Sequence, residues 1–267
     1  ENEDLIESKL ELGHVMNSES DRPRGRCEDS TTMIVRGVDC RKIELHFSTM
    51  ASDAKKRNRV IDYNVQSHGT SETTVEQAEQ LVYEGLCRLH EEWKAEGHED
   101  NEGGLHFADL TLIDKGWMGS WTDDGEKKTW ASQPVERFCT EKGIRHFLPA
   151  KGQPSYRQPD PSREVIIGDN WHINRGKGRE RICSEVIWNA EHWHSLVEGL
   201  FMTAEDDPHG FELFASEPGL WINHKRLAEH IREGSADLAE LRKRATKTRK
   251  PKYRRDHFWD SFAMMLV

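Results

Sequence analysis

The sequence predicts an α/β fold, in which helices lie on the faces of a mixed β-sheet. Three observations predict it. Apolar segments of strand length alternate with segments of helical periodicity, which is the order expected when crossover helices join the strands of one sheet. The 267 residues are enough for one large domain or two small ones. Hydrophobic residues make up 35% of the chain and charged residues 32%, which indicates a globular protein with a water-exposed surface.

The first part of the chain is expected to hold a lead-in and two strands. Residues 1–30 are polar and acidic, and we expect a loose segment there with a short helix over 5–12. The segments 33–49 and 59–66 are rich in β-branched and aromatic residues and predict strands, with a polar turn between them.

A long helix is expected to follow these strands. Thr73 and Glu76 stand three residues apart and predict a capping box at its start. Its apolar residues recur at helical spacing, and they are Val75, Ala78, Val82, Leu86, Leu89 and Trp93. An acidic, glycine-rich loop ends it.

The rest of the chain is expected to mix strands and helices. The expected strands share short aliphatic or aromatic runs and cover 105–117, 144–153, 210–216 and 219–223. The expected helices cover 134–143, 184–202, 224–235 and 255–267. Between them, 163–182 is expected to form a hairpin or a long exposed loop.

The charge of the chain is unevenly distributed. A formal net charge of −10, taken alone, argues against nucleic acid as a partner. Residues 239–255, however, carry nine Lys and Arg against one Glu, and such a strip can bind phosphates. A solvated helix end is the alternative interpretation. If the strip binds DNA, these residues would follow the phosphates without reading sequence: Arg242, Lys243, Lys247, Arg249, Lys250, Lys252, Arg254 and Arg255.

A second basic segment lies at 172–181. Its cations are Arg175, Lys177, Arg179 and Arg181. It could contact a DNA backbone, and an exposed loop without function is the alternative.

The composition also disfavours several classes of protein. No run of eighteen apolar residues exists, so we expect no membrane span, and the acidic start of the chain is unlike a signal peptide. Five cysteines without a close pair argue against a disulfide framework and a zinc ribbon, and fit a reducing cytoplasm. His192 and His194 would face apart on a helix, which disfavours zinc.

Three acidic residues stand out by their positions. Asp39 interrupts an apolar strand, and Asp114 ends another. Asp260 lies in the closing helix near His257, and Asp256 is the main alternative to Asp260 as the third acid. Three buried carboxylates that point at one place repel each other unless a cation lies between them. Hard oxygen ligands favour Mg²⁺ or Mn²⁺, and two such ions can clamp the attacking and leaving oxygens of a phosphodiester. We therefore expect Asp39 to hold metal at the centre of the sheet.

Each acid also has an ordinary structural interpretation. Asp39 could pair with Arg36 or Arg41 at a sheet edge. Asp114 precedes a Lys-Gly pair and could be a turn residue. Asp260 could be a plain helix acid, and spacing alone leaves these alternatives open.

Five segments of the chain, taken in order, resemble one protein family. They read GVDCRKIELHF, RVIDYNVQSHG, LTLIDKGW, VERFCTEKGIRHFLPAKG and DHFWDSFAMML, and they run from about residue 33 to the end. With them, the chain resembles the C-terminal nuclease domain of phage terminase large subunits, in particular the lambda-like branch. The ordered set carries the resemblance, because each segment alone is short.

The resemblance implies a fold and an activity. It implies an RNase H-like domain over residues 31–267, with 1–30 as the remnant of an interdomain linker. It implies an endonuclease that cuts double-stranded viral DNA with two Mg²⁺ or Mn²⁺ ions during genome packaging, in the cytoplasm of an infected bacterial host. The implied partners are the terminase ATPase domain, the small terminase subunit and the portal, with no membrane.

The resemblance also implies roles for individual residues. Asp39 matches the first-strand acid of the family, Asp114 the second-strand acid and Asp260 the helix acid. His257 matches a histidine found beside the metals in some relatives. Lys151 matches a lysine of the family's Lys-Gly segment and would contact DNA.

One departure from the family concerns its motor. Terminase large subunits carry an ATPase domain with a phosphate-binding loop of the form GxxxxGK[ST]. No such loop exists here, because no Ser or Thr follows the pair Gly176 and Lys177, and Trp171 stands where the first Gly belongs. The chain is therefore expected to be an isolated nuclease domain or a stand-alone relative. The alternatives are a junction-resolving or transposase-type nuclease of the same fold, and a DNA-binding or packaging module that does not cut.

Overall fold

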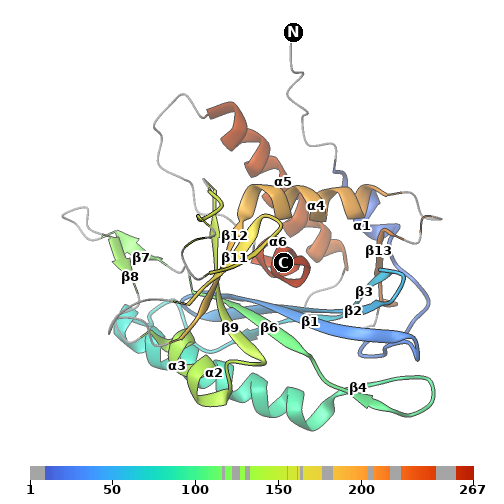
Figure 1. Ribbon diagram of the computed structural model, residues 1–267, viewed down its shortest axis with the longest axis horizontal. Helices are drawn as coiled ribbons and strands as arrows, with labels where there is room; N and C mark the ends of the chain where they lie inside the picture. Colours follow the sequence, from blue (N-terminus) through green and yellow to red (C-terminus); the bar gives the residue numbers. More distant parts are fainter. Residues whose placement is uncertain are drawn as a thin grey trace.

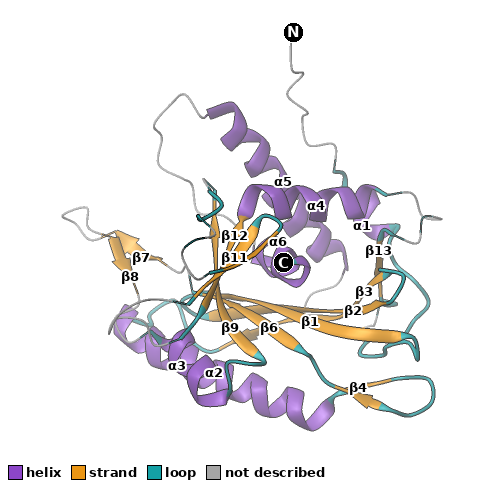
Figure 2. Ribbon diagram, in the orientation of Figure 1, coloured by secondary structure: helices purple, strands orange, loops and turns teal. Residues whose placement is uncertain are grey.

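The computed structural model centres on a mixed β-sheet with helices against both faces (Figures 1 and 2). It describes residues 10–115, 118–121, 127–129, 133–154, 156–160, 162, 165–175, 183–203, 207, 209–216, 224–244 and 257–267. The expected α/β fold is confirmed over these residues. The strand expected at 219–223 and the part of the basic strip at 245–255 lie outside them.

The sheet joins strands that are far apart in the sequence. Across the described residues its order is β10 (Ile166–Gly168), β11 (Trp171–Asn174), β12 (Glu185–Asn189), β9 (Phe147–Gln153), β6 (Leu110–Asp114), β1 (Thr31–Cys40), β2 (Glu44–Asp53), β3 (Asn58–Ser67) and β13 (Phe211–Leu213). The strands β1, β2 and β3 form an antiparallel meander. The strand β6 is parallel to β1, β9 to β6, and β12 to β9. The carboxyl ends of these four strands therefore meet at one end of the sheet.

Helices cover the two faces in separate groups. One face is covered by α2 (Val75–Glu96) and α3 (Pro134–Lys142), which also connect β3 to β6 and β6 to β9 as crossovers. The other face is covered by α1 (Leu12–Met16), α4 (Ala190–Met202), α5 (His224–Arg244) and α6 (His257–Leu266). Figure 1 shows this second group above the sheet and the first group below it.

Among the described residues, two small hairpins stand outside the main sheet. They are formed by β4 (His98–Glu99) with β5 (Leu105–His106), and by β7 (Met118–Trp121) with β8 (Lys127–Thr129). In the first, the turn is fixed by Asp100, whose Oδ1 accepts hydrogen bonds from the backbone N–H groups of Gly104 at 2.7 Å and Glu102 at 3.0 Å.

The helix α6 packs directly onto β1 because of a glycine. A Cβ atom at Gly37 would lie 2.0 Å from the carbonyl oxygen of Ser261, so only glycine lets the helix come this close. Nearby, the Ser48 hydroxyl on β2 donates to the Ser261 hydroxyl over 2.9 Å. From α5, Gly234 approaches α6 in the same way, since a Cβ there would lie 2.8 Å from the Trp259 ring. These contacts set the position of α6 over the sheet.

The strand predictions need two corrections. The segment 33–49 is two antiparallel strands, because the chain reverses after Cys40 and Cys40 pairs with Leu45. Asp39 is thus the penultimate residue of β1 and not a mid-strand residue. The segment 105–117 likewise divides into β5 and β6, because Asp109 turns its side chain back to accept the backbone N–H of Ile34 at 2.8 Å.

Two helix predictions were also wrong in part. The long helix α2 begins one residue later than expected, with Thr74 and Gln77 as its capping box, because the Thr73 hydroxyl accepts from the Thr70 backbone N–H. The segment 184–202 begins as the strand β12, and only then forms α4. Both faces of β12 are covered, so its apolar residues do not alternate with polar ones.

The segment before β1 packs against the domain from residue 10 onward. Leu10 and Val15 belong to the same hydrophobic core as α4, α5 and α6, and Cys27 is buried against Ile34 and Ile61 on β1 and β3. Of the helices described, none is both long and apolar enough to cross a membrane.

Candidate functional site

Asp39 and Asp114 lie side by side at the carboxyl ends of neighbouring parallel strands. The register of β1 against β6 pairs Val38 with Ile113, and the two acids follow these residues directly. Paired strands lie about 4.8 Å apart. The charges of both acids act on the same buried thiol: after burial itself, Asp114 and then Asp39 raise the pKa of Cys40 well above its usual value.

Both carboxylates point toward α6. Gly37, two residues before Asp39, faces Ser261 of that helix. Leu112, two residues before Asp114, belongs to the core beneath α6. Because side chains alternate along a strand, each acid shares the face of the residue two positions before it.

Asp260 approaches the same place from above. It lies in the first turn of α6, where the helix dipole favours a negative charge. Its neighbours Phe258, Trp259 and Phe262 are fully buried or nearly so, and they hold this turn against the core. The side chain of Asp260 is 26% exposed, whereas that of Asp39 is completely buried.

Arg41 connects the strand acid to the helix acid. Its Nε donates to Oδ2 of Asp39 over 2.7 Å, and its Nη2 donates to Oδ2 of Asp260 over 3.3 Å. The pairing of Asp39 with Arg41, one of the alternatives from the sequence, is thereby confirmed. Arg36 lies on the opposite face, where its guanidinium carbon is 3.9 Å from the centre of the Trp93 ring.

His194 of α4 holds the other oxygen of Asp260. Its Nε2 lies 3.0 Å from Oδ1 of Asp260, and a carboxylate oxygen accepts, so Nε2 is the donor. The imidazole is fixed between two indoles, with centroids 5.5 Å from Trp188 and 5.4 Å from Trp259. From the sequence, His194 was considered only as a zinc ligand together with His192, so this contact was missed. Trp188 and Trp259 meet His194 only in the folded chain, and no local signal in the sequence marks the contact.

The end of β6 is anchored on the other face of the sheet. Lys115 follows Asp114 and forms ion pairs with Glu136 of α3, at 3.1 Å, and with Glu185 of β12. Burial tends to lower the pKa of Lys115, but the two carboxylates outweigh burial and raise it above its usual value. The backbone N–H of Lys115 also donates to Ala150 over 3.0 Å, which continues the pairing of β6 with β9 past Asp114. These bonds fix the backbone that carries the second acid.

The donor set suits a hard divalent cation. Three carboxylates from β1, β6 and α6 supply the oxygen ligands that Mg²⁺ and Mn²⁺ prefer. As they stand, no three His, Cys, Asp or Glu side chains of the described residues are arranged to hold a metal ion. The Arg41 guanidinium lies between Asp39 and Asp260 and supplies positive charge there. Asp39, Asp114 and Asp260 are thus the residues that would hold a metal ion if this guanidinium moved away.

The candidate DNA-binding residues are placed only in part. Lys151 is exposed on β9, and alternation puts it on the face opposite Asp114, because its neighbour Ala150 belongs to the core on the α6 face. Arg175 is exposed just after β11, three strands from β6, or roughly 14 Å along the sheet. The other members of the set lie outside the described residues: Lys177, Arg249, Lys250, Lys252, Arg254 and Arg255. The side chain of His257 and all of Asp256 lie outside them as well.

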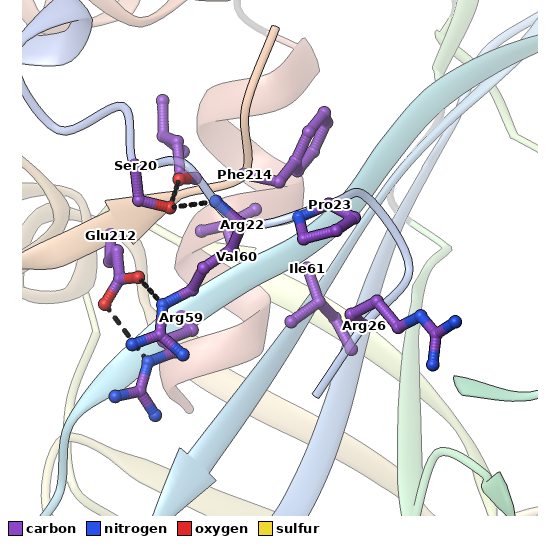
Figure 3. A pocket seen from close by; sticks show the side chains of 10 residues that line it. Ser20, Arg22, Pro23, Arg26, Arg59, Val60, Ile61, Glu212 and Phe214 are labelled. Atoms are coloured by element: carbon purple, nitrogen blue, oxygen red, sulfur yellow. Dashed lines mark hydrogen bonds and ion pairs between the residues drawn. The ribbon is translucent and has the colours of Figure 1, made fainter. Parts of the chain in front are cut away.

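A pocket at the other end of the sheet does not belong to this site. Arg22, Arg59 and Glu212 line it, and both arginines form ion pairs with Glu212 (Figure 3). Arg59 is in register with Ala51 on β2, and Ala51 with Ile34 near the start of β1. The pocket has a volume of about 10 Å³, which is room for a single water molecule. It is too small for a substrate.

Comparisons with known proteins do not identify a family. No family model, no curated protein and no solved structure matches this chain. The roles of the acids therefore remain predictions that depend on their geometry and on the resemblance described above.

Proposed function

We propose that this chain is an endonuclease that hydrolyses phosphodiester bonds of double-stranded DNA with bound Mg²⁺ or Mn²⁺. The observation that carries the proposal is the position of Asp39 and Asp114 on adjacent parallel strands, on the face that α6 covers, with Asp260 of α6 joined to Asp39 through Arg41. Two-metal hydrolysis requires carboxylates that converge from separate rigid elements.

We also propose that the fold is RNase H-like. In that fold, three antiparallel strands are followed by parallel strands that crossover helices join, and the first acid lies on the first strand. The order β3-β2-β1-β6-β9 supports this, as do the crossovers α2 and α3 and the position of Asp39 on β1.

The residues of the site would have distinct tasks. Asp39, Asp114 and Asp260 would hold the ions, and His194 would keep Asp260 in place. Bound divalent ions supply positive charge to the reacting phosphate and lower the pKa of a bound water. Lys115 holds the end of β6, so that Asp114 keeps its distance from Asp39 without relying on the metal.

The biological setting is proposed from the resemblance. The five ordered segments support a role in cutting viral DNA during packaging, with a terminase ATPase domain, a small terminase subunit and a portal as partners. The basic strip at 239–255 would hold the phosphate backbone, which offsets the overall negative charge of the chain.

The first test is cleavage of supercoiled plasmid. The purified chain is incubated with EDTA, Mg²⁺ or Mn²⁺, beside the variant Asp39→Asn, which keeps the shape of the side chain and removes its charge. We expect nicking or linearisation with metal only, and a loss of at least about a hundredfold in the variant.

The matched control is Asp53→Asn. Asp53 is also buried and paired with an arginine, Arg57, but it lies at the opposite end of the β1–β2 pair. This variant should cut like the wild type. Full activity of Asp39→Asn in Mn²⁺ would refute the assignment. Preference for branched over linear DNA would indicate a junction-resolving or transposase-type nuclease, and DNA binding without cutting in either metal would indicate a packaging module.

A further inference from the structure

We propose that Arg41 is the built-in counter-ion of the acidic cluster, and that a divalent ion must displace its guanidinium in order to bind. Arg41 would then set the metal affinity of the site. This inference rests on the proposed function, because it assumes that Asp39 and Asp260 are metal ligands.

The position of the guanidinium supports this role. It donates from two different nitrogens, Nε to Asp39 and Nη2 to Asp260, to carboxylates that lie 221 residues apart in the sequence (260 − 39). In each acceptor the bond is made to Oδ2. A metal ion bound by the same two oxygens would occupy the space between them, which is where the guanidinium now lies.

The charge of Arg41 explains why Asp39 can be buried. The Asp39 side chain has no exposed surface, and an ionised carboxylate in that position needs a cation close by. Arg41 supplies one charge, and a divalent ion would supply two. Both cations together would repel each other at this distance, so binding of the ion favours departure of the arginine.

The side chain of Arg41 can leave without a change of the backbone. Its own N–H donates to the Glu44 carbonyl over 2.9 Å, which holds the turn between β1 and β2. The side chain is 32% exposed, so a change of rotamer can carry the guanidinium into solvent. Exchange of the two cations is then a local movement.

The competing interpretation is that Arg41 is a permanent part of the site. A permanent arginine would position Asp39 and Asp260 for the metal, and its removal would weaken metal binding. A displaced arginine competes with the metal, and its removal would strengthen metal binding. The two interpretations therefore predict opposite signs.

The test is a calorimetric titration of the full chain with Mn²⁺. We expect Arg41→Gln to bind Mn²⁺ more tightly than the wild type, by on the order of tenfold. In EDTA, the same variant should melt at a lower temperature by on the order of 5–10 °C, because Asp39 loses its counter-ion, and saturating Mn²⁺ should restore most of that loss. Arg57→Gln is the matched control, because Arg57 also pairs with a buried acid, Asp53, and it should leave Mn²⁺ affinity unchanged.

A second measurement uses the wild-type protein, so it does not depend on the stability of a variant. The Nε–H resonance of Arg41, identified by its absence in Arg41→Lys, should change on addition of diamagnetic Mg²⁺ as the bond to Asp39 breaks. Equal or weaker Mn²⁺ binding by Arg41→Gln, or an Arg41 resonance that is unaffected by saturating Mg²⁺, would overturn the inference.

The outcomes also separate the inference from the proposed function. If the wild type binds metal and cuts DNA, but Arg41→Gln binds no more tightly, only the inference fails. If Arg41→Gln binds Mn²⁺ more tightly and neither protein cuts DNA, the inference stands and the nuclease proposal fails. If no form binds metal, both fail.

Discussion

Asp260 is held at one oxygen by His194 and at the other by Arg41. If a metal ion displaces Arg41 as proposed, His194 is the partner that stays in place. We therefore expect His194→Ala to let Asp260 rotate and to weaken Mn²⁺ affinity by roughly ten- to a hundredfold. His194→Gln keeps an N–H donor and should recover a large part of the affinity. Calorimetric titration with Mn²⁺ measures both.

A neighbouring histidine provides the control for this prediction. His192 lies on the exposed side of the same helix, so His192→Ala should not change Mn²⁺ affinity. If His194→Ala and His192→Ala behave alike, then His194 does not position Asp260. A loss that Gln does not repair would point to imidazole chemistry instead of a hydrogen bond.

At the scale of elements, the position of α6 depends on Gly37. A Cβ atom at this position would lie 2.0 Å from the Ser261 carbonyl oxygen, and backbone cannot move aside as a flexible side chain can. Gly37→Ala should therefore push α6 away from β1 and lower the free energy of unfolding by about 1–3 kcal/mol. Urea unfolding measures this change.

Gly13→Ala is the control, because it makes the same substitution at a position where a Cβ atom has free space. A Cβ atom there would have nothing within 4 Å, and Gly13 lies inside the short helix α1. Alanine should be neutral there or add up to about 1 kcal/mol, because it has the higher helix propensity. Equal stability of the two variants would show that α6 does not depend on close approach to Gly37.

Elements whose ends are marked by particular residues were predictable from the sequence. Elements whose pattern depends on burial of both faces of the sheet were not. The helix α3 was expected at 134–143 and is found at Pro134–Lys142, because proline at its start and Gly143 after its end mark both limits. The strand β12 was mistaken for helix. Its Val186, Ile187 and Trp188 are all buried because the sheet is covered on both faces, and no short window of sequence shows that.

At the scale of the whole molecule, a buried histidine links stability to pH. His98 lies between Arg36, whose Nη2 is 3.2 Å from its Nε2, and the Gly25 carbonyl oxygen, 3.3 Å from its Nδ1. A guanidinium can only donate, so Nε2 accepts from Arg36 and Nδ1 donates to the Gly25 carbonyl. With a proton on Nδ1 alone, the ring is neutral. Burial and then the charge of Arg36 lower the pKa of His98 to about 4.

The sign of the pH dependence follows from this lowered pKa. Between pH 6.5 and about 4 the unfolded chain binds a proton at His98 and the folded protein does not, so stability falls as pH falls. From pH 7 to pH 4.5 this residue should cost roughly 2–3 kcal/mol. Chemical denaturation of wild type and His98→Gln at both pH values measures it. The variant should lose less stability on acidification, whereas His209→Gln, at an exposed position, should follow the wild type.

The acidic residues of the candidate site could be selected from the sequence, but their basic partners could not. Asp39 was selected because it interrupts an apolar strand, Asp114 because it ends one, and Asp260 because it lies in an apolar helix, and all three are local properties of the sequence. Which cation reaches Asp260 depends on how α4 and the β1–β2 turn lie against α6. Only the fold determines that, so Arg41 could be suspected as a partner of Asp39 but not as a bridge.

The late position of α6 in the chain has a consequence for synthesis. Asp39 and Asp114 leave the ribosome early, but the helix that brings Asp260 is formed by residues 257–266, after all the described strands of the main sheet have been made. Until that helix docks beside Gly37, the nascent chain carries two of its three acids on an uncovered face. The cluster is therefore completed only after residues 257–266 have been made and docked, and a cutting activity built on it would stay silent until then.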